Sequence, residues 1–570
     1  MSEDNSSPES TFIPFQNIGL CFSGGGYRAT FYSLGILSYL NKVKFKEKPL
    51  LEYVEALSSV SGGTLLAVAY AKSAQDTKHS FTDFFKAFYQ TFEPKNDKLL
   101  DTAIKKLEDD TVWKNNTYKT RSLINAFALT YAEMEVFKGD FSMFENPASK
   151  HLKQVCYNAT DFSFGLTYRF QNTGVFGSSP LSNTSVEKLK FKVQLGDIIA
   201  SSSCFPLGFE PLQFPDDYFK DHNTTDYKAL KSLDRFIDGV GIMDGGIADN
   251  QGIGSMIRIN ERMKNALSLI IVNDVGSFKM VPWRQDNSFE KKGVSLKQFV
   301  AKALAYFRIK PLYWILLLLG VIMVVINSMK IFNHCDDCGS PAIYIIGSIL
   351  IGIGLTLTLL GGFASVVLKF FKGKMASLFK KNVPEPLVDD ILSFKKLDIG
   401  LVQQMLTNRL TSAVKMINDV FLKQMRRLNY DLFYSKYSLQ NKRITTTVYK
   451  LNGQKTPYSG AQPNYNKDIK PAPSKLLMSV GLTASETPTT LWWDKKDIAK
   501  NRMDTLIACG QFTLCYELME YILELKKSES DLKIDFTEID ELYKQLKKDW
   551  KEFNEDPFFA LEELKNKCLE

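Results

Sequence analysis

Ser61 lies in a segment of small residues whose order is typical of a serine nucleophile on a sharp turn. Residues 59–63 read Ser-Val-Ser-Gly-Gly, and the apolar stretch Val54–Leu57 before them predicts a strand. The stretch Thr64–Ala71 after them is rich in Ala and Leu and predicts a helix. A strand-to-helix turn exposes the serine hydroxyl, and small neighbours permit close approach by a substrate. The segment therefore indicates a covalent nucleophile at Ser61.

Two further segments contain the groups that such a nucleophile needs. Residues 23–28 read Ser-Gly-Gly-Gly-Tyr-Arg, and their backbone N–H groups are candidates for an oxyanion hole. Residues 244–246 read Asp-Gly-Gly, which makes Asp244 a candidate base. A second aspartate, Asp238, is also followed by Gly, but the residues after it do not repeat this pattern.

The glycine-rich segment also fits a dinucleotide-binding fingerprint. From residue 24 it reads Gly-x-Gly-x-x-Ala, between a predicted strand (Ile18–Phe22) and a predicted helix (Tyr27–Leu40). A dinucleotide site also needs an acidic residue roughly twenty positions further on. Lys48 and Pro49 stand near that offset. The hydrolase interpretation is therefore favoured over the nucleotide one.

The three segments, in this order, resemble those of the patatin-like phospholipases and, more distantly, of the cytosolic phospholipase A2 group. Residues 200–206 read Ala-Ser-Ser-Ser-Cys-Phe-Pro and resemble a fourth family block near the active site. Asn250 stands where the family usually has an Asn after its Asp-Gly-Gly. The resemblance covers roughly residues 15–275 and, more weakly, 475–525.

This resemblance implies an α/β fold with a mainly parallel sheet flanked by helices, and a Ser-Asp dyad that works without a metal or other cofactor. In such a dyad Asp244 accepts the proton of Ser61. The resemblance also implies that Arg28 contacts the lipid phosphate; packing along its helix or a salt bridge is the alternative. The remaining candidates are Gly24, Gly25 and Gly26 for the oxyanion hole, and Ser202, Pro206 and Asn250 for the substrate site.

The sequence departs from the family pattern at two positions. Ser59 stands where the family usually has Gly, and Gly252 stands where a Pro often follows the Asn. Ser59 favours the alternative function class, a membrane-interaction protein that oligomerises and retains a vestigial esterase site. A histidine-based triad is not predicted, because none of the four histidines, at positions 79, 151, 222 and 334, lies in a motif.

Composition fits a globular enzyme attached to a membrane. The chain has 570 residues, 45% of them hydrophobic, and a net charge of +8. This modest positive charge suits an anionic membrane surface better than nucleic acid, since no basic run interleaved with aromatics marks a nucleic-acid groove. Residues 1–14 are polar and acidic and lack the basic and apolar regions of a secretory signal.

Two long apolar runs predict a transmembrane hairpin. Residues 312–329 contain no charge over 18 positions, and residues 343–368 contain none over 26. About 20 apolar residues span a bilayer as a helix. Two buried core helices are the alternative, but basic clusters flank the pair on both sides. The positive-inside rule then predicts a two-pass protein whose termini and catalytic domain are cytoplasmic.

Within the second run, Ser348, Gly352 and Thr356 recur every four residues and predict a face of close helix packing. That face is satisfied either by the first helix or by another chain in a homo-oligomer. The connecting loop carries Cys335 and Cys338, for which a disulfide or a zinc site shared across an oligomer are the two alternatives. Five of the other cysteines, at positions 21, 156, 204, 509 and 515, are expected to be reduced core residues.

The predicted organisation has five parts. They are a disordered N-terminus (1–14), a patatin-like catalytic domain (15–300), the transmembrane hairpin with its basic flanks (301–383), a helical region that completes the catalytic unit and contains a mobile loop at 452–474 (384–525), and a charged C-terminal helix (526–570). The predicted function is hydrolysis of fatty-acyl esters in membrane phospholipid, of phospholipase A or lysophospholipase type.

Overall fold

In the computed structural model, the described residues are 12–179, 188–276, 282–287, 293–295, 298, 301–302, 305, 310–329, 340–382, 397–455, 463–528 and 534–569. The chain divides into two compact units. One comprises Met1–Val281 and Ile417–Glu570, and we call it the sheet unit. The other, Pro282–Met416, we call the hairpin unit. Each is described by itself.

An eight-stranded sheet forms the centre of the sheet unit, with the order β10-β9-β1-β4-β5-β8-β7 and β6 paired to β5. The strands β10, β9, β1, β4 and β5 are parallel, whereas β6, β8 and β7 pair in antiparallel fashion. The predicted mainly parallel sheet flanked by helices is therefore confirmed. The strand bounds are β1 Ile18–Phe22, β4 Val54–Val60, β5 Gln154–Asp161, β6 Leu166–Gln171, β7 Leu212–Phe214, β8 Val240–Asp244, β9 Leu269–Asp274 and β10 Arg443–Thr447.

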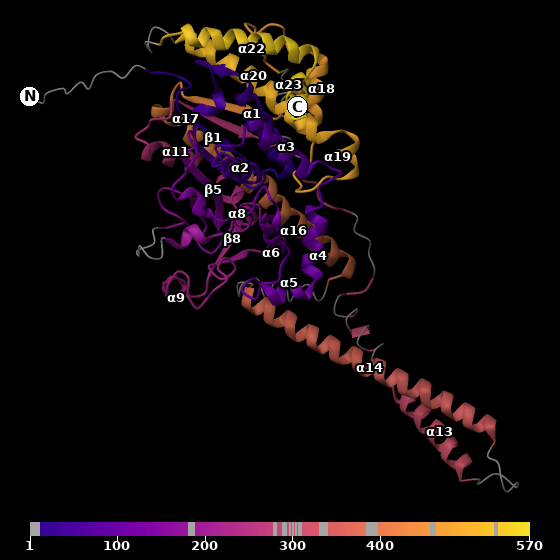
Figure 1. Cartoon of the computed structure of the whole chain (residues 1–570). Helices are drawn as coiled ribbons and strands as arrows, with labels where there is room; N and C mark the ends of the chain where they lie inside the picture. Colours follow the sequence, from indigo (N-terminus) through magenta and orange to yellow (C-terminus); the bar gives the residue numbers. More distant parts are fainter. Residues whose placement is uncertain are drawn as a thin grey trace, which may run out of the picture. The chain divides into compact units, whose positions relative to one another are not determined.

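Helices cover the sheet, as Figure 1 shows. The helix α1 packs closely against α20, because a Cβ on Gly35 of α1 would lie 2.0 Å from the carbonyl oxygen of Ile507. Such close packing explains why glycines face each other there. The helix bounds in this unit are α1 Gly26–Lys42, α2 Gly62–Ser73, α3 Phe81–Phe92, α4 Leu99–Glu108, α5 Asp110–Asn115, α6 Leu123–Glu133, α8 Leu195–Ser202, α9 Thr225–Lys231, α10 Gly246–Asp249, α11 Ile253–Arg262, α17 Leu422–Ser435, α18 Lys475–Ser485, α19 Lys495–Ala499, α20 Arg502–Lys527, α22 Thr537–Glu555 and α23 Phe559–Lys567.

The C-terminal helix α22 packs on the core through one apolar stripe. Ile539, Leu542, Leu546, Trp550 and Phe553 are all buried, and their helical spacing places them on one face of α22. The expectation of reduced core cysteines is confirmed as well for the five of them at 21, 156, 204, 509 and 515, which are free and buried.

The hairpin unit contains two long apolar helices, α13 Pro311–Ser328 and α14 Pro341–Asn382. Their most apolar windows have mean hydropathies of 2.1 and 2.3, and only 11% of each window is buried, so neither is a core helix. Both are long and apolar enough to cross a membrane. The second helix continues beyond the charge-free run that predicted it. It includes the basic residues after position 368 and ends at Asn382. A third helix, α16, covers Ile399–Lys415.

Glycines bring α13 and α14 together. A Cβ on Gly320 would lie 2.7 Å from the carbonyl oxygen of Gly347, and one on Gly354 would lie 2.8 Å from the backbone nitrogen of Leu317. By contrast, nothing lies within 4 Å of a Cβ built on Gly352. The face of Ser348, Gly352 and Thr356 is therefore not the one that packs within the hairpin, and all three residues are exposed. The connecting loop with Cys335 and Cys338 lies outside the described residues.

Candidate active site

Ser61 occupies a sharp turn between β4 and α2, as its neighbours predict. Its backbone angles are φ 51° and ψ −125°, a conformation that non-glycine residues rarely adopt. The turn is held from both sides, since the Ser61 N–H donates to Ser202 Oγ at 2.8 Å and its carbonyl accepts from the Thr64 N–H at 2.8 Å. A Cβ on Gly62 would lie 2.0 Å from the carbonyl oxygen of Gly26, so this position requires glycine.

The strand β5 brings Asp244 to Ser61. The last residue of β4, Val60, pairs with Asn158, and the next residue of β5, Ala159, pairs with Asp244 at the end of β8. Because β8 runs antiparallel to β5, the strands β4 and β8 end at adjacent positions. The residue after β4 and the last residue of β8 are therefore neighbours, although 183 positions separate them in the sequence.

The carboxylate of Asp244 is placed as a base would be. Its side chain is buried, and burial raises its pKa to about 6, while hydrogen bonds from the Ser61 hydroxyl and the Gly246 N–H lower it. The Gly246 N–H lies 2.6 Å from Asp244 Oδ1. Asp238, in contrast, is exposed and does not line the same cleft. A carboxyl with a pKa near 6 is largely ionised at neutral pH and is a stronger base than an ordinary aspartate.

The glycine loop lies beside this pair. The Gly24 N–H donates to the Asn250 carbonyl at 2.9 Å, and the Tyr27 N–H donates to the Thr490 carbonyl at 2.8 Å. Gly25 and Gly26 lie between these two residues. Within the described part of the chain, their N–H groups donate to no backbone carbonyl beyond the hydrogen bonds inside helices and strands. Gly25 has φ 142° and Gly26 has φ 53°, which other residues rarely adopt. These two N–H groups precede or begin α1, where the helix dipole favours negative charge.

Ser202, at the end of α8, connects the Ser61 turn to β5 through a chain of hydrogen bonds. Its hydroxyl donates to the Asn158 carbonyl at 2.6 Å, so its oxygen accepts from Thr64 at 2.8 Å. The Thr64 oxygen in turn accepts from the Ser59 hydroxyl at 2.9 Å. Ser59 thus joins the hydrogen bonds that hold the turn, although the family usually has Gly at this position.

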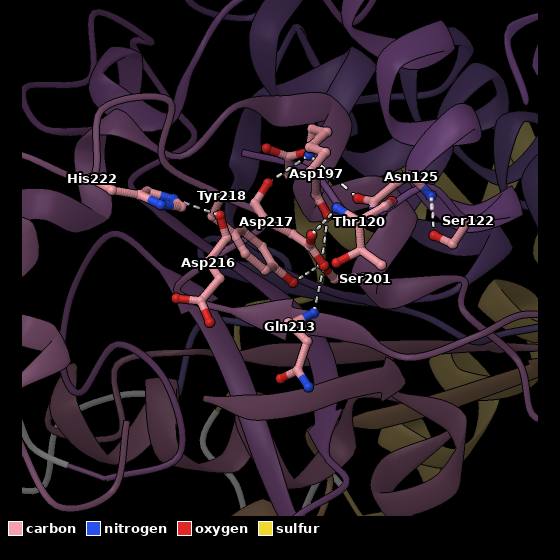
Figure 2. A network of polar contacts seen from close by, with 11 residues as sticks. Thr120, Ser122, Asn125, Asp197, Ser201, Gln213, Asp216, Asp217, Tyr218 and His222 are labelled. Atoms are coloured by element: carbon pink, nitrogen blue, oxygen red, sulfur yellow. Dashed lines mark hydrogen bonds and ion pairs between the residues drawn. The ribbon is translucent and has the colours of Figure 1, made fainter. Parts of the chain in front are cut away.

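A buried network holds α8 in place and is drawn in Figure 2. Lys119 donates to Asp197 Oδ1 at 2.7 Å and to the Asp217 carbonyl at 2.7 Å. The Asp217 carboxylate accepts from the backbone N–H groups of Thr120 and Gln213, each at 2.7 Å. Burial raises the pKa of Asp197 more than Lys119 lowers it. This network fixes the first turn of α8, whose last residue is Ser202.

Gly252 explains the second departure from the family pattern. It has φ 69°, which proline cannot adopt because its ring fixes φ near −65°. A Cβ at this position would also lie 2.6 Å from the Ser58 hydroxyl. Ser58 donates to the Gly252 carbonyl at 2.8 Å, so the backbone here approaches β4 directly.

Arg28 is buried one turn into α1 and donates to the Thr487 carbonyl at 3.0 Å and the Ser485 carbonyl at 3.4 Å. Burial lowers the pKa of its guanidinium to about 10. Among the described residues its Nε has no hydrogen-bond partner, and no carboxylate pairs with it. Arg28 thus holds the end of α18 without the salt bridge that was one alternative for it, and it lines the cleft together with Ser61.

These groups open into a cleft of about 680 Å³. Of the predicted site residues, the cleft brings together Gly24, Gly25, Gly26, Arg28, Ser61, Pro206, Asp244 and Asn250. Ser202 lies behind the turn and does not line the cleft. The wall also contains residues that the sequence pattern did not identify: Leu422, Lys423 and Arg426 of α17, and Thr489, Thr490 and Trp492 after α18.

The helix α17 is fastened to the end of β9 by a buried ion pair. Arg426 donates to Asp274 Oδ2 at 2.7 Å and to the Gly276 carbonyl at 3.0 Å, and Tyr430 donates to Asp274 at 2.7 Å. Asp274 is fully buried. A helix more than 140 residues distant in sequence thus becomes a fixed wall of the cleft.

Histidines take no part in the described cleft. His151 contacts Tyr70, His222 stacks on Tyr227, and His79 pairs with Asp76, all outside it. His334 lies outside the described residues. The arrangement of serine, buried carboxylate and available N–H groups can generate an alkoxide nucleophile and stabilise an oxyanion, which is the chemistry of a serine acyl hydrolase.

Residues 20–257 match the family model described as "Patatin-like phospholipase". Residues 20–257 of this chain are therefore a patatin-like phospholipase domain. Among curated proteins, none matches the chain with significance.

Two solved structures are similar to part of the chain. Human GIVD cytosolic phospholipase A2 is 14% identical, with 46% of this chain and 45% of that chain covered and a TM-score of 0.28. The same human protein in complex with methyl gamma-linolenyl fluorophosphonate inhibitor and terbium chloride is 13% identical, with 40% and 34% covered and a TM-score of 0.25. The chain thus spans less than half the length of these proteins.

Proposed function

We propose that this protein is a membrane-anchored serine hydrolase that cleaves fatty-acyl esters of membrane phospholipids through Ser61 and Asp244. The observation that carries the proposal is the end-to-end meeting of β4 and β8 on adjacent residues of β5, which places a strained serine beside a buried carboxylate. The glycine loop and the cleft on the same side supply an oxyanion site and room for a substrate.

In the proposed reaction, the Asp244 carboxylate takes the proton of the Ser61 hydroxyl as the oxygen attacks the ester carbonyl. The carbonyl electrons move to its oxygen, which the N–H groups of Gly25 and Gly26 stabilise. When the tetrahedral intermediate collapses, the ester C–O bond breaks and the leaving alcohol takes the proton from Asp244. Water then repeats these steps on the acyl-enzyme, which releases the fatty acid and restores Ser61.

Phospholipid is the proposed substrate because the cleft combines an apolar wall with cationic groups. Pro206 and Leu422 line it together with Arg28 and Lys423. Arg28 lines the same cleft as the dyad and has no carboxylate partner among the described residues, which supports phosphate binding by this residue. Asn250 contributes its backbone to the glycine loop, so we assign it a positioning role as well as contact with the substrate.

The apolar helices α13 and α14 are proposed to anchor the enzyme in the bilayer as a two-pass hairpin. The basic residues on both flanks support cytoplasmic termini and a cytoplasmic catalytic domain. Protease protection of tags at the two termini in sealed cells tests this orientation. The exposed face of Ser348, Gly352 and Thr356 further supports self-association of the hairpin, because close helix packing drives association in lipid.

Release of fatty acid from phospholipid vesicles by the purified full chain tests the proposed activity. The wild-type protein is expected to release fatty acid, and Ser61→Ala is expected to release none above the background. A protein that anchors in membranes and hydrolyses neither vesicles nor soluble esters would instead support the membrane-interaction alternative. Ser59, the residue that favours that alternative, hydrogen-bonds to Thr64 within the turn.

A further inference from the structure

Several large apolar side chains near the cleft are exposed to solvent. Phe162, Phe164 and Leu166 at the β5–β6 turn are 61%, 55% and 43% exposed. In the loop after α8, Phe205 is 38% exposed and Leu207 68%, and before β8 Ile237 is 54% exposed. We call these six residues the apolar rim. Soluble proteins rarely expose such a group of large apolar side chains, so it marks an interaction surface.

The rim is continuous with the cleft. Phe205 and Leu207 line the cleft itself, and the Asp244 N–H donates to the carbonyl of the preceding Cys204 at 2.9 Å. Further along this loop, Pro211 and Phe162 meet over β8: a Cβ on Gly241 would lie 3.4 Å from one and 3.7 Å from the other. The rim therefore begins in the cleft at Phe205 and Leu207 and includes Phe162, which lies over the first part of β8.

The turn that carries the phenylalanines is rigidly built. Asp161 is fully buried, and its Oδ1 accepts from the Phe164 N–H at 3.0 Å. Its Oδ2 accepts from Arg235 at 2.5 Å, and the Arg235 guanidinium lies 4.6 Å from the ring centroid of Phe164. The Phe162 N–H donates to the Gly241 carbonyl at 2.8 Å. These bonds hold the apolar side chains outward in a defined arrangement.

A second part of the cleft wall has similar chemistry. Val420 and Phe421, just before α17, are 46% and 60% exposed, and the next residues, Leu422 and Lys423, line the cleft. Exposed apolar side chains thus lie next to cleft residues in two separate segments of the chain. A partner that is apolar inside and polar at its surface suits both segments.

We propose that the apolar rim docks on the surface of a lipid bilayer and inserts its phenylalanines and leucines among the acyl chains, so that the cleft mouth meets the membrane. The inference rests on the proposed function, since a phospholipid substrate has to leave the bilayer and enter this cleft. Apolar side chains that enter the acyl boundary bind by the area they bury. The apolar helices of the hairpin would hold the chain at the membrane, and the rim would orient the cleft.

Insertion can be measured without enzyme activity. The full chain with Phe164→Trp is reconstituted in phosphatidylcholine vesicles, and its fluorescence is quenched with brominated lipid. Leu476→Trp is the matched control, because Leu476 is 53% exposed on α18 and lies outside the rim. Brominated lipid is expected to quench the tryptophan at 164, beyond the native background, and not the one at 476. Equal quenching at both positions, or none at 164, would overturn the proposal. No quenching at 164 is the result expected if the rim instead bound a protein or a second copy of this chain.

Activity gives a second, separable test. Phe164→Ser with Ile237→Ser should lower hydrolysis of vesicle phospholipid roughly tenfold or more, since burial of two large apolar side chains is lost. Hydrolysis of a short soluble ester should not change, and Leu476→Ser should match the wild type on both substrates. Unchanged vesicle hydrolysis in the double variant would contradict docking through the rim. If the wild type hydrolyses neither substrate, the proposed function fails, and the quenching result still decides the docking.

Discussion

At the scale of single residues, the site depends on a serine held in an unfavourable conformation and an aspartate held away from water. Both conditions have visible causes. Ser61 is held by hydrogen bonds from Thr64 and to Ser202, and the carboxylate of Asp244 has a raised pKa because it is buried. Strain and burial of this kind cost stability and persist at functional sites.

The proposed dyad predicts non-additive losses. Asp244→Asn should lower the rate of ester hydrolysis at least about a thousandfold, and combining it with Ser61→Ala should cost no more than Ser61→Ala alone, because the two residues act as a unit. Steady-state hydrolysis of a soluble ester measures this. Asp238→Asn is the matched control, since that aspartate is exposed at the other end of β8. Additive losses, or an active Ser61→Ala, would contradict the assignment.

The pKa of Asp244 predicts the pH dependence. A base works in its ionised form, and burial raises the pKa of this carboxyl to about 6. The value of kcat/KM for an uncharged soluble ester should therefore be constant above this pKa and fall about tenfold for each pH unit below it. The effect on stability has the opposite direction. The pKa of Asp244 is raised in the folded state, so its ionisation lowers the free energy of unfolding as the pH rises. Asp244→Asn should thus be at least as stable as the wild type at neutral pH. A flat rate profile between about pH 5 and pH 7 would contradict the role of this base.

Much of this residue-level description could be predicted from the sequence. The strand Ile18–Phe22 has the predicted bounds, and Ser61 stands at the predicted turn. The prediction for β4 ended three residues early, because Ser58 and Ser59 resemble turn residues but pair with β5. The pairing of β8 with β5 carries no local signal, so the meeting of β4 and β8 could not be predicted. The wall residues Thr489 and Arg426 were missed for the same reason, since only tertiary packing brings them to the cleft.

At the scale of elements, the short helix α8 connects the site to a buried ion pair. Its first turn carries Asp197, which pairs with Lys119, and its last residue is Ser202, which holds the nucleophile turn. Side chains in such a network depend on one another, because a buried charge without its partner is costly.

This network predicts a large and partly compensated loss of stability. Lys119→Met should lower the free energy of unfolding by about 3–5 kcal/mol, because Asp197 would remain buried without its partner. Lys119→Met with Asp197→Leu should lose less than Lys119→Met alone, since no unpaired carboxylate remains. Denaturant unfolding measures both. A double variant less stable than Lys119→Met would contradict this account.

A second element-scale prediction concerns the exposed small-residue face of α14. Gly352→Leu should reduce crosslinking between chains in native membranes, because a large side chain on this face prevents close approach. Within the hairpin there is space for the new side chain, since nothing lies within 4 Å of a Cβ at Gly352. Ile353→Leu is the matched control, at an exposed neighbour outside this face. An unchanged crosslinking pattern for Gly352→Leu, or a wild type that does not crosslink, would leave the hairpin an anchoring role only.

At the scale of the whole molecule, the chain leaves the sheet unit after β9 and returns to it just before α17. The intervening hairpin unit contains both apolar helices, and α17 and the residues after α18 complete the walls of the cleft. The sequence predicted the apolar helices from their lack of charge. It also predicted that residues 384–525 complete the catalytic unit, but it did not identify α17 as a wall of the cleft, because α17 has no motif and is held at the end of β9 by tertiary contacts of Arg426 and Tyr430 with Asp274.

Covalent labelling by a fluorophosphonate tests whether Ser61 is an activated nucleophile. The reagent phosphorylates a serine that is activated as a nucleophile, and mass spectrometry of the labelled full chain locates the modified residue. The account predicts one modified serine, Ser61, in the wild type, strongly slowed labelling in Asp244→Asn, and no labelling in Ser61→Ala. Labelling of Ser61→Ala at the wild-type rate, or a wild type that stays unlabelled while folded, would contradict the Ser61–Asp244 site.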